Sequence, residues 1–182
     1  MKNRIYSIIK LSLISILFSQ FYSCIFLITG SIAQKEAEKS ISAKNGAFPE
    51  NFMENKSTLV VITGDNKSYN KYLVKDFKKY YSGACVFIKS IDFADSKYDD
   101  KDKYRYIFDY DLETHYYRSS ELELPAEFRN NIRGSSVTVR RFYLIDRKED
   151  QFYQSSVTSS YFSKVIKVYA QKLNQQMIEN QK

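Results

Sequence analysis

The chain has 182 residues, of which 43% are hydrophobic and 16% aromatic, with a formal net charge of +7. This composition excludes a disordered or fibrous protein and supplies enough apolar material for the core of one domain. The moderate positive charge is ordinary for a soluble domain and gives only a weak preference for anionic partners.

The first 33 residues have the pattern of an export signal. Lys2, Arg4 and Lys10 precede a run of uncharged residues that ends before Lys35. The sequence Gly30-Ser31-Ile32-Ala33 then places small residues at positions −3 and −1 of a peptidase site. We therefore predict a signal peptide over residues 1–33, cleavage between Ala33 and Gln34, and export to the periplasm or cell envelope.

Two alternatives keep the protein on a membrane. The uncharged run is long enough to span ~30 Å of hydrocarbon as a single-pass anchor over residues 11–33. Ser23 also provides the small residue that precedes an acylated cysteine in lipoprotein signals, which makes Cys24 a lipidation candidate. If the leader is removed, Cys85 is the only thiol left and no internal disulfide forms.

Residues 34–56 are polar and lack a sustained apolar period, so we expect a linker, either a tether or a loose first helix, before an α/β domain over residues 57–182. That domain begins with Thr58-Leu59-Val60-Val61-Ile62, whose continuous apolar run predicts a strand buried on both faces. Asp65 or Asn66 then caps a helix, and residues 84–88 form a second strand. The helix is expected to bury a stripe formed by Tyr69, Leu73, Phe77 and Tyr80.

Gly64-Asp65-Asn66 lies at the carboxyl end of the first strand, where α/β folds often bind phosphate. A phosphate loop needs several glycines so that backbone N–H groups can approach the ligand, and here there is one. We expect no nucleotide and no other cofactor.

The middle of the chain is acidic and aromatic. Residues 104–110 alternate in polarity and predict a third strand, which we expect nearer an edge of the sheet, with His115 in an exposed turn beyond it. Asp109, Asp111 and Glu113 match the first positions of a calcium loop, but the glycine and the final carboxylate are missing. A single histidine cannot assemble a zinc site. No metal site is expected.

The C-terminal third predicts a hairpin of residues 136–145 and 151–154, followed by a helix capped by Ser159 or Ser160. The helix should have a frayed end and an apolar stripe of Phe162, Val165, Ile166, Tyr169, Leu173 and Met177. Together these elements predict an α/β fold with a mixed sheet of about five strands.

This order of elements, together with Phe142-Tyr143-Leu144-Ile145-Asp146-Arg147-Lys148, resembles a thioredoxin-type domain over roughly residues 58–175. The Cys-x-x-Cys of that family is absent, since Gly64-Asp65-Asn66-Lys67 stands in its place, and Ser135-Ser136 lies near the position of the family's cis-proline. Redox activity is therefore not implied. The bias toward Lys, Asn, Tyr and Ile and the leader ending near Ala33-Gln34 also resemble exported proteins of Bacteroidetes-type bacteria.

The most basic region of the predicted domain is our candidate surface for an anionic partner; it consists of Arg129, Arg133, Arg140, Arg141, Arg147 and Lys148. We expect a non-enzymatic binding or scaffolding domain that contacts another protein or an anionic envelope component. Nucleic acid is not expected, because export removes the protein from it. The alternative is a degenerate thioredoxin-like or hydrolytic enzyme that uses His115 with Asp109, Asp111 or Glu113.

Overall fold

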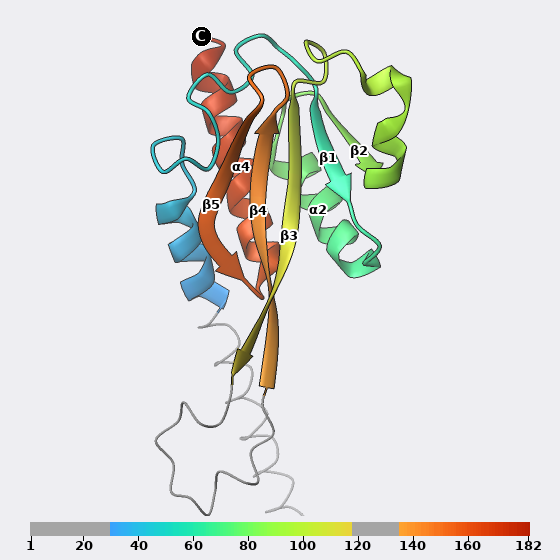
Figure 1. Ribbon diagram of the computed structural model, residues 1–182. Helices are drawn as coiled ribbons and strands as arrows, with labels where there is room; N and C mark the ends of the chain where they lie inside the picture. The colour runs from blue at the N-terminus through green and yellow to red at the C-terminus, as the bar shows by residue number, and fades with distance from the viewer. Residues whose placement is uncertain (1–29, 118–134) are drawn as a thin grey trace, which may run out of the picture.

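The structure is a computed structural model that describes residues 30–117 and 135–182 (Figure 1). A helix over residues 30–40 comes first. The elements that follow in chain order are β1 (Leu59–Thr63), α2 (Lys67–Tyr80), β2 (Cys85–Lys89), the 3-10 helices η1 (Ser90–Ala94) and η2 (Ser96–Tyr98), β3 (Tyr106–Tyr117), β4 (Ser135–Asp146), β5 (Gln151–Ser159) and α4 (Phe162–Asn180).

The strands form one mixed sheet in the order β2-β1-β3-β4-β5. β1 pairs in parallel with β2 and β3, whereas β4 is antiparallel to both β3 and β5. The predicted α/β class with five strands is confirmed. β3 occupies the middle of the sheet, so its predicted place near an edge is wrong, because the β4–β5 hairpin adds beyond it.

β1 is buried on both faces, as its apolar run predicts. Leu59 and Val61 belong to the larger core, and Val60 and Ile62 belong to a second cluster on the opposite face. The second cluster also contains Tyr98, which η2 contributes. Side chains on alternate sides of one strand therefore join two apolar layers.

Helices α2 and α4 lie together on one face of the sheet (Figure 1). The cap of α2 is Asn66, whose Oδ1 accepts a hydrogen bond from the Tyr69 N–H at 3.0 Å. The predicted stripes of both helices are buried, except that Tyr80 and Phe162 are only half-buried. α4 begins after Tyr161 without a side-chain cap, so the predicted serine cap is wrong.

Residues 34–56, predicted as a linker, pack into the domain instead. Ile41, Phe48, Phe52 and Met53 are all fully or almost fully buried, and the Phe52 ring lies 4.9 Å from the ring of Tyr106. Some of these apolar residues lie in irregular turns. Their burial cannot be predicted from the sequence, because they follow neither the helical nor the strand period. The folded unit therefore includes this segment.

The same segment holds the last turn of α4. Asn180 Nδ2 donates to the backbone oxygens of Glu50 at 2.7 Å and Phe52 at 2.9 Å, and Gln176 Nε2 donates to the Glu50 oxygen at 2.8 Å. The predicted frayed end is therefore wrong. The apolar spacing of α4 fades toward its C-terminal end, and there the polar side chains of Gln176 and Asn180 hydrogen-bond the segment before β1.

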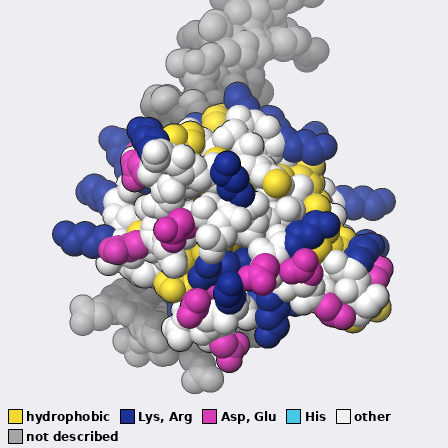
Figure 2. Space-filling view, turned by 90° about the horizontal axis from the view of Figure 1, so that it is seen from above, with side chains coloured by type: hydrophobic (Ala, Val, Ile, Leu, Met, Phe, Trp, Pro, Cys, Tyr) yellow, Lys and Arg dark blue, Asp and Glu magenta, His cyan; other side chains and the backbone are white. Residues whose placement is uncertain are grey.

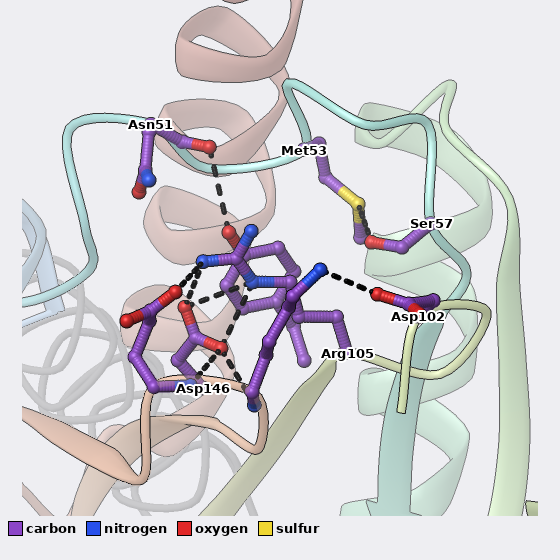
Figure 3. A network of polar contacts seen from close by, with 9 residues as sticks. Asn51, Met53, Ser57, Asp102, Arg105 and Asp146 are labelled. Carbon is purple, nitrogen blue, oxygen red and sulfur yellow. Dashed lines mark hydrogen bonds and ion pairs between the residues drawn. The ribbon is translucent and has the colours of Figure 1, made fainter. Parts of the chain in front are cut away.

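A buried ion pair closes the end of the sheet where β4 finishes (Figure 3). Arg105 donates from Nε to Asp146 Oδ1 at 2.9 Å and from its terminal nitrogen to Oδ2 at 2.6 Å. Both side chains are almost fully buried. Asp146 also accepts the backbone N–H of Lys148, so one carboxylate fixes both the start of β3 and the β4–β5 turn.

Among the helices of the described ranges, none combines the length and the apolar character that crossing a membrane requires. Residues 1–29 of the predicted leader, including Cys24, lie outside these ranges. Signal cleavage, acylation and export stay predictions.

Candidate functional site

The side chain of Arg140 lies among three aromatic rings from three other elements. Its guanidinium carbon is 4.7 Å from the centroid of Phe162, 5.2 Å from that of Tyr69 and 5.5 Å from that of Tyr110. The rings come from α4, α2 and β3, and the arginine comes from β4. We call these four residues the Arg140 cage. Cation–π contacts of this kind hold a guanidinium in a fixed orientation.

Local chemistry at the end of β1 positions two of the rings. The Asn66 cap starts α2 so that Tyr69, in its first turn, faces the sheet. Gly64 permits the close approach of Tyr110, because a Cβ at this position would collide with the Tyr110 hydroxyl. The Tyr69 and Tyr110 rings then pack 4.4 Å apart.

Two polar atoms of the cage are buried without a hydrogen-bond partner. They are the Tyr69 hydroxyl and Arg140 Nε. Burial, and then the neighbouring Tyr110, raises the pKa of the Tyr69 hydroxyl, which stays protonated. Within residues 30–117 and 135–182, no carboxylate forms an ion pair with Arg140. The cage therefore presents a positive charge that the described part of the chain does not neutralise.

The other residues of the predicted basic surface have structural partners. Arg141 binds Glu113 across the β3–β4 pair, with Nε 2.9 Å from Oε1. Arg147 donates to the backbone oxygens of Tyr98 at 2.7 Å and Tyr104 at 3.0 Å, and it lies over the Phe93 ring. Lys148 Nζ is 2.6 Å from Asp102 Oδ1. Arg129 and Arg133 lie outside the described residues.

These basic side chains do not share one surface. Arg140 and Arg141 are neighbours in a strand and point to opposite faces of the sheet. Arg147 follows the end of β4, about 20 Å farther along at ~3.3 Å per residue. Figure 2 shows that basic and acidic side chains alternate over the end of the molecule seen from above. Among the described residues of the predicted set, Arg140 is the one that forms neither an ion pair nor a hydrogen bond to a backbone oxygen, unlike Arg141, Arg147 and Lys148.

A cleft lies at the carboxyl end of β1, lined by Thr63, Gly64, Asp65, Lys89, Ser90 and Ile91. This is where parallel sheets usually bind ligands. Both backbone groups of Gly64 are occupied, since its N–H donates to Asn70 Oδ1 at 3.1 Å and its oxygen accepts from Asn70 Nδ2 at 2.7 Å. The turn therefore offers no free Gly64 N–H group for a phosphate.

The residues of the enzymatic alternative lie along β3. The strand continues through His115, whose backbone pairs with Val137, so the predicted exposed turn is wrong. Its side chain lies outside the description. Asp109 accepts a hydrogen bond from the Tyr143 hydroxyl at 3.2 Å, and burial raises its pKa while the bonds from the Tyr110 N–H and Tyr143 oppose the rise. These contacts occupy both Asp109 oxygens.

No group of three or more metal-ligating side chains occurs in the part of the chain that the structure describes. Cys85 is a free, half-buried thiol in β2, and burial raises its pKa, which keeps it protonated. Cys85 therefore is not an activated thiolate, and it lies at the amino end of β2.

Comparison of the chain with protein-family models, with curated proteins and with solved structures finds no match. The resemblances to thioredoxin-type domains and to exported proteins of Bacteroidetes-type bacteria stay expectations.

The basic set predicted from the sequence includes Arg140, but the pattern does not predict the cage. Spacing places Tyr69 and Phe162 in helix stripes and Tyr110 on one face of a strand, which accounts for all three as core residues. Tyr69 and Phe162 both lie in the first turn of their helices, which is the one signal that the sequence offers. Placing Tyr110 beside Arg140 also requires the β3–β4 register, in which Leu112 pairs with Arg140.

Proposed function

We propose that this protein is an exported, non-enzymatic binding domain of the cell envelope that captures an anionic group of a partner through Arg140. The partner is a protein carboxylate or an anionic envelope component. The observation that carries the proposal is a guanidinium held by three rings, with no carboxylate partner among the described residues.

The chemistry of arginine suits this role. A guanidinium is planar and always charged, and its N–H groups match the geometry of carboxylate or phosphate oxygens. Because Arg140 Nε is buried, the terminal N–H groups are the ones that would contact an anion. Because the rings fix the side chain before binding, less conformational entropy is lost when an anion binds. The cage therefore favours recognition of an anion over a purely structural ion pair.

Exposed apolar groups lie next to the cage. Leu112 pairs with Arg140 in the β3–β4 register and is 58% exposed, and Tyr72, 39% exposed, packs edge-on against Phe162. An exposed aliphatic group and an aromatic ring beside a preorganised arginine resemble the composition of protein-binding hot spots. This arrangement supports a partner that contributes both an anion and an apolar surface.

Photo-crosslinking in cells of the native host tests the proposal. A photoreactive p-benzoylphenylalanine replaces Leu112, and the adducts are identified by mass spectrometry. We expect a defined adduct that disappears when Arg140→Gln is added. The same probe at exposed Lys101, on a loop at the other end of β3, should not give this adduct.

Lys148→Gln is the matched charge control, because it removes one positive charge from an exposed surface pair. The adduct at position 112 should survive this change. An adduct equally strong in Arg140→Gln, or lost equally in Lys148→Gln, would show that Arg140 does not select the partner.

The intact mass of the protein from fractionated host cells tests export. The proposal expects a mass that corresponds to residues 34–182 in the soluble envelope fraction. A full-length chain in the cytoplasmic fraction would contradict it, and an acylated chain beginning at Cys24 would place the domain on a membrane.

A further inference from the structure

β3 has a long edge on the side facing β1 that pairs with β1 at only two positions. The bridges to β1 join Val60 to Ile107 and Val61 to Phe108, whereas β3 pairs with β4 along its whole length from Tyr106 to Tyr117. Beyond Phe108, no other strand of the described ranges pairs with this edge. Figure 1 shows β3 continuing past the end of β1.

The backbone groups along this edge can be assigned by alternation. The Tyr110 N–H donates to its neighbour's side chain, Asp109 Oδ1, at 2.8 Å, which places it outside the β4 ladder. In an antiparallel pair, every second residue directs its N–H and C=O away from the partner strand. Leu112 and Thr114 are two and four residues after Tyr110, so by this alternation their backbone N–H and C=O groups also point away from β4, toward the open edge of β3.

A cleft of about 330 Å³ lies against the start of this edge. Its lining includes Thr63 and Gly64 from the end of β1 and Asp109 to Leu112 from β3. Leu112 and Thr114 are exposed. An extended segment placed here would continue the line of β1, at the ~4.8 Å spacing of neighbouring strands.

The two faces of the edge differ in chemistry. Asp109, Asp111 and Glu113 lie on one face, while Tyr110 and Leu112 lie on the other. Asp111 is exposed and forms no ion pair with another described residue, because Arg141 binds Glu113 instead. A strand with basic side chains on one face and apolar side chains on the other complements this pattern.

We propose that the open edge of β3 at residues 110–114 binds an extended segment of a partner protein, with alternating basic and apolar side chains, by β-strand addition. Backbone hydrogen bonds supply affinity in this mode, and alternate side chains supply specificity. A second copy of this chain is a poorer occupant. Antiparallel self-pairing about Leu112 would place Asp111 opposite Glu113, and like charges in that position are destabilising. Tyr110 and Leu112 also lie at the Arg140 cage, but this inference rests on the backbone groups of β3 and not on the Arg140 guanidinium.

Amide hydrogen exchange with a synthetic peptide tests it. The probe is acetyl-Lys-Val-Lys-Val-Lys-Val-amide, and the matched control replaces each Lys with Glu. With the free probe at ten times its Kd, exchange at Leu112 and Thr114 should slow about tenfold, since these amides exchange from the unbound state. The Asp111 and Glu113 amides already face β4 and should change little.

Two variants isolate the edge. Leu112→Pro removes an outward N–H at a position where an edge strand tolerates proline, and it should abolish the protection at Thr114. Asp111→Asn conserves shape and should weaken binding about threefold, as expected for one exposed charge pair. Asp99→Asn, an exposed carboxylate on the loop before β3, should leave binding unchanged.

Protection with the Lys peptide but not the Glu peptide supports the proposal. Equal protection by both peptides would overturn the charge complementarity. Absence of protection by either peptide, or amides of Leu112 and Thr114 that are already protected in the free protein, would show that the edge is not open to a partner strand.

Discussion

Asp146 is an almost fully buried carboxylate that pairs with a buried arginine. It receives the Arg105 guanidinium in a bidentate arrangement, and both side chains are withdrawn from water. Removing one partner of such a pair leaves an uncompensated buried charge, which costs more than the pair itself contributes. The pair therefore fixes the β3 and β4 ends whatever its net contribution to stability.

We predict that Asp146→Asn lowers the free energy of unfolding by ~3–5 kcal/mol in a urea titration. The Lys148→Gln variant breaks the neighbouring exposed pair with Asp102 and should change stability little, because solvent screens surface ion pairs. Similar losses in the two variants would show that the Arg105–Asp146 pair is exposed to water in solution.

Asp109 makes stability depend on pH in a defined direction. Burial raises its pKa above the ordinary carboxyl value of about 4. The folded state therefore binds the proton more tightly than the unfolded state does. The contribution of this carboxyl to stability is most favourable below the unfolded-state pKa and is lost as pH rises through the higher folded-state value.

Asp109→Asn should accordingly raise the melting temperature at pH 7, because it removes the buried charge. The Asn oxygen can still accept from the Tyr110 N–H, and its NH2 group can donate to the Tyr143 hydroxyl oxygen. The difference from the wild type should shrink as pH falls from the raised folded-state pKa toward about 4, below which the wild-type carboxyl is neutral in both states. Melting curves recorded across this range measure it. A wild type that is more stable than the variant at pH 7 would contradict the role given to burial.

At the scale of elements, helix stripes are the best-specified features of the sequence. Tyr69, Leu73 and Phe77 in α2, and Val165, Ile166 and Leu173 in α4, recur at helical spacing and are fully buried in the fold. Spacing along one element predicts such burial. It does not predict the Arg140 cage, which depends on four elements that meet only after the sheet forms.

Phe77→Ala and Ile166→Ala should each cost ~2–5 kcal/mol in denaturant titrations, because each leaves a cavity in a close-packed layer. Ile178→Ala, on the same helix as Ile166 but 43% exposed, is the matched control and should cost clearly less. A loss below about 1 kcal/mol at Phe77 or Ile166 would contradict the assignment of that residue to the core.

Element boundaries were harder to predict than element types. β3 runs to Tyr117 because its register with β4 continues through His115, although the clean alternation of aromatic residues ends at Tyr110. Pairing with a partner strand, rather than the strand's own pattern, sets its length. For the same reason the open edge beside Leu112 could not be predicted from β3 alone.

At the scale of the whole molecule, the folded unit begins earlier than the polar composition of residues 34–56 indicates. Phe48, Phe52 and Met53 fill the core, and Asn180 binds the backbone of the same segment. A few apolar residues in irregular turns are enough to complete the core. Their burial depends on where the turns lie in the fold and not on any periodicity in the sequence. The five-stranded sheet was predictable from the sequence, whereas this contribution was not.

A chain that begins at residue 57 should therefore fail to unfold cooperatively, since it exposes the apolar surface that Phe52 covers on Tyr106. A chain that begins at residue 30 should retain a cooperative thermal transition by circular dichroism. Equal cooperativity in both chains would mean that residues 30–56 pack on a domain that is complete without them.

The central claim is that Arg140 is a preorganised anion site, and NMR of arginine side chains tests it most directly. The Nε–Hε resonances are followed while acetate or inorganic phosphate is added to the folded domain at constant ionic strength. Arg105, held by Asp146, is the internal control. We predict a saturable shift at Arg140 with no matching change at Arg105. An Arg140 resonance that does not move, or that moves in parallel with those of Arg141 and Arg147, would contradict the claim.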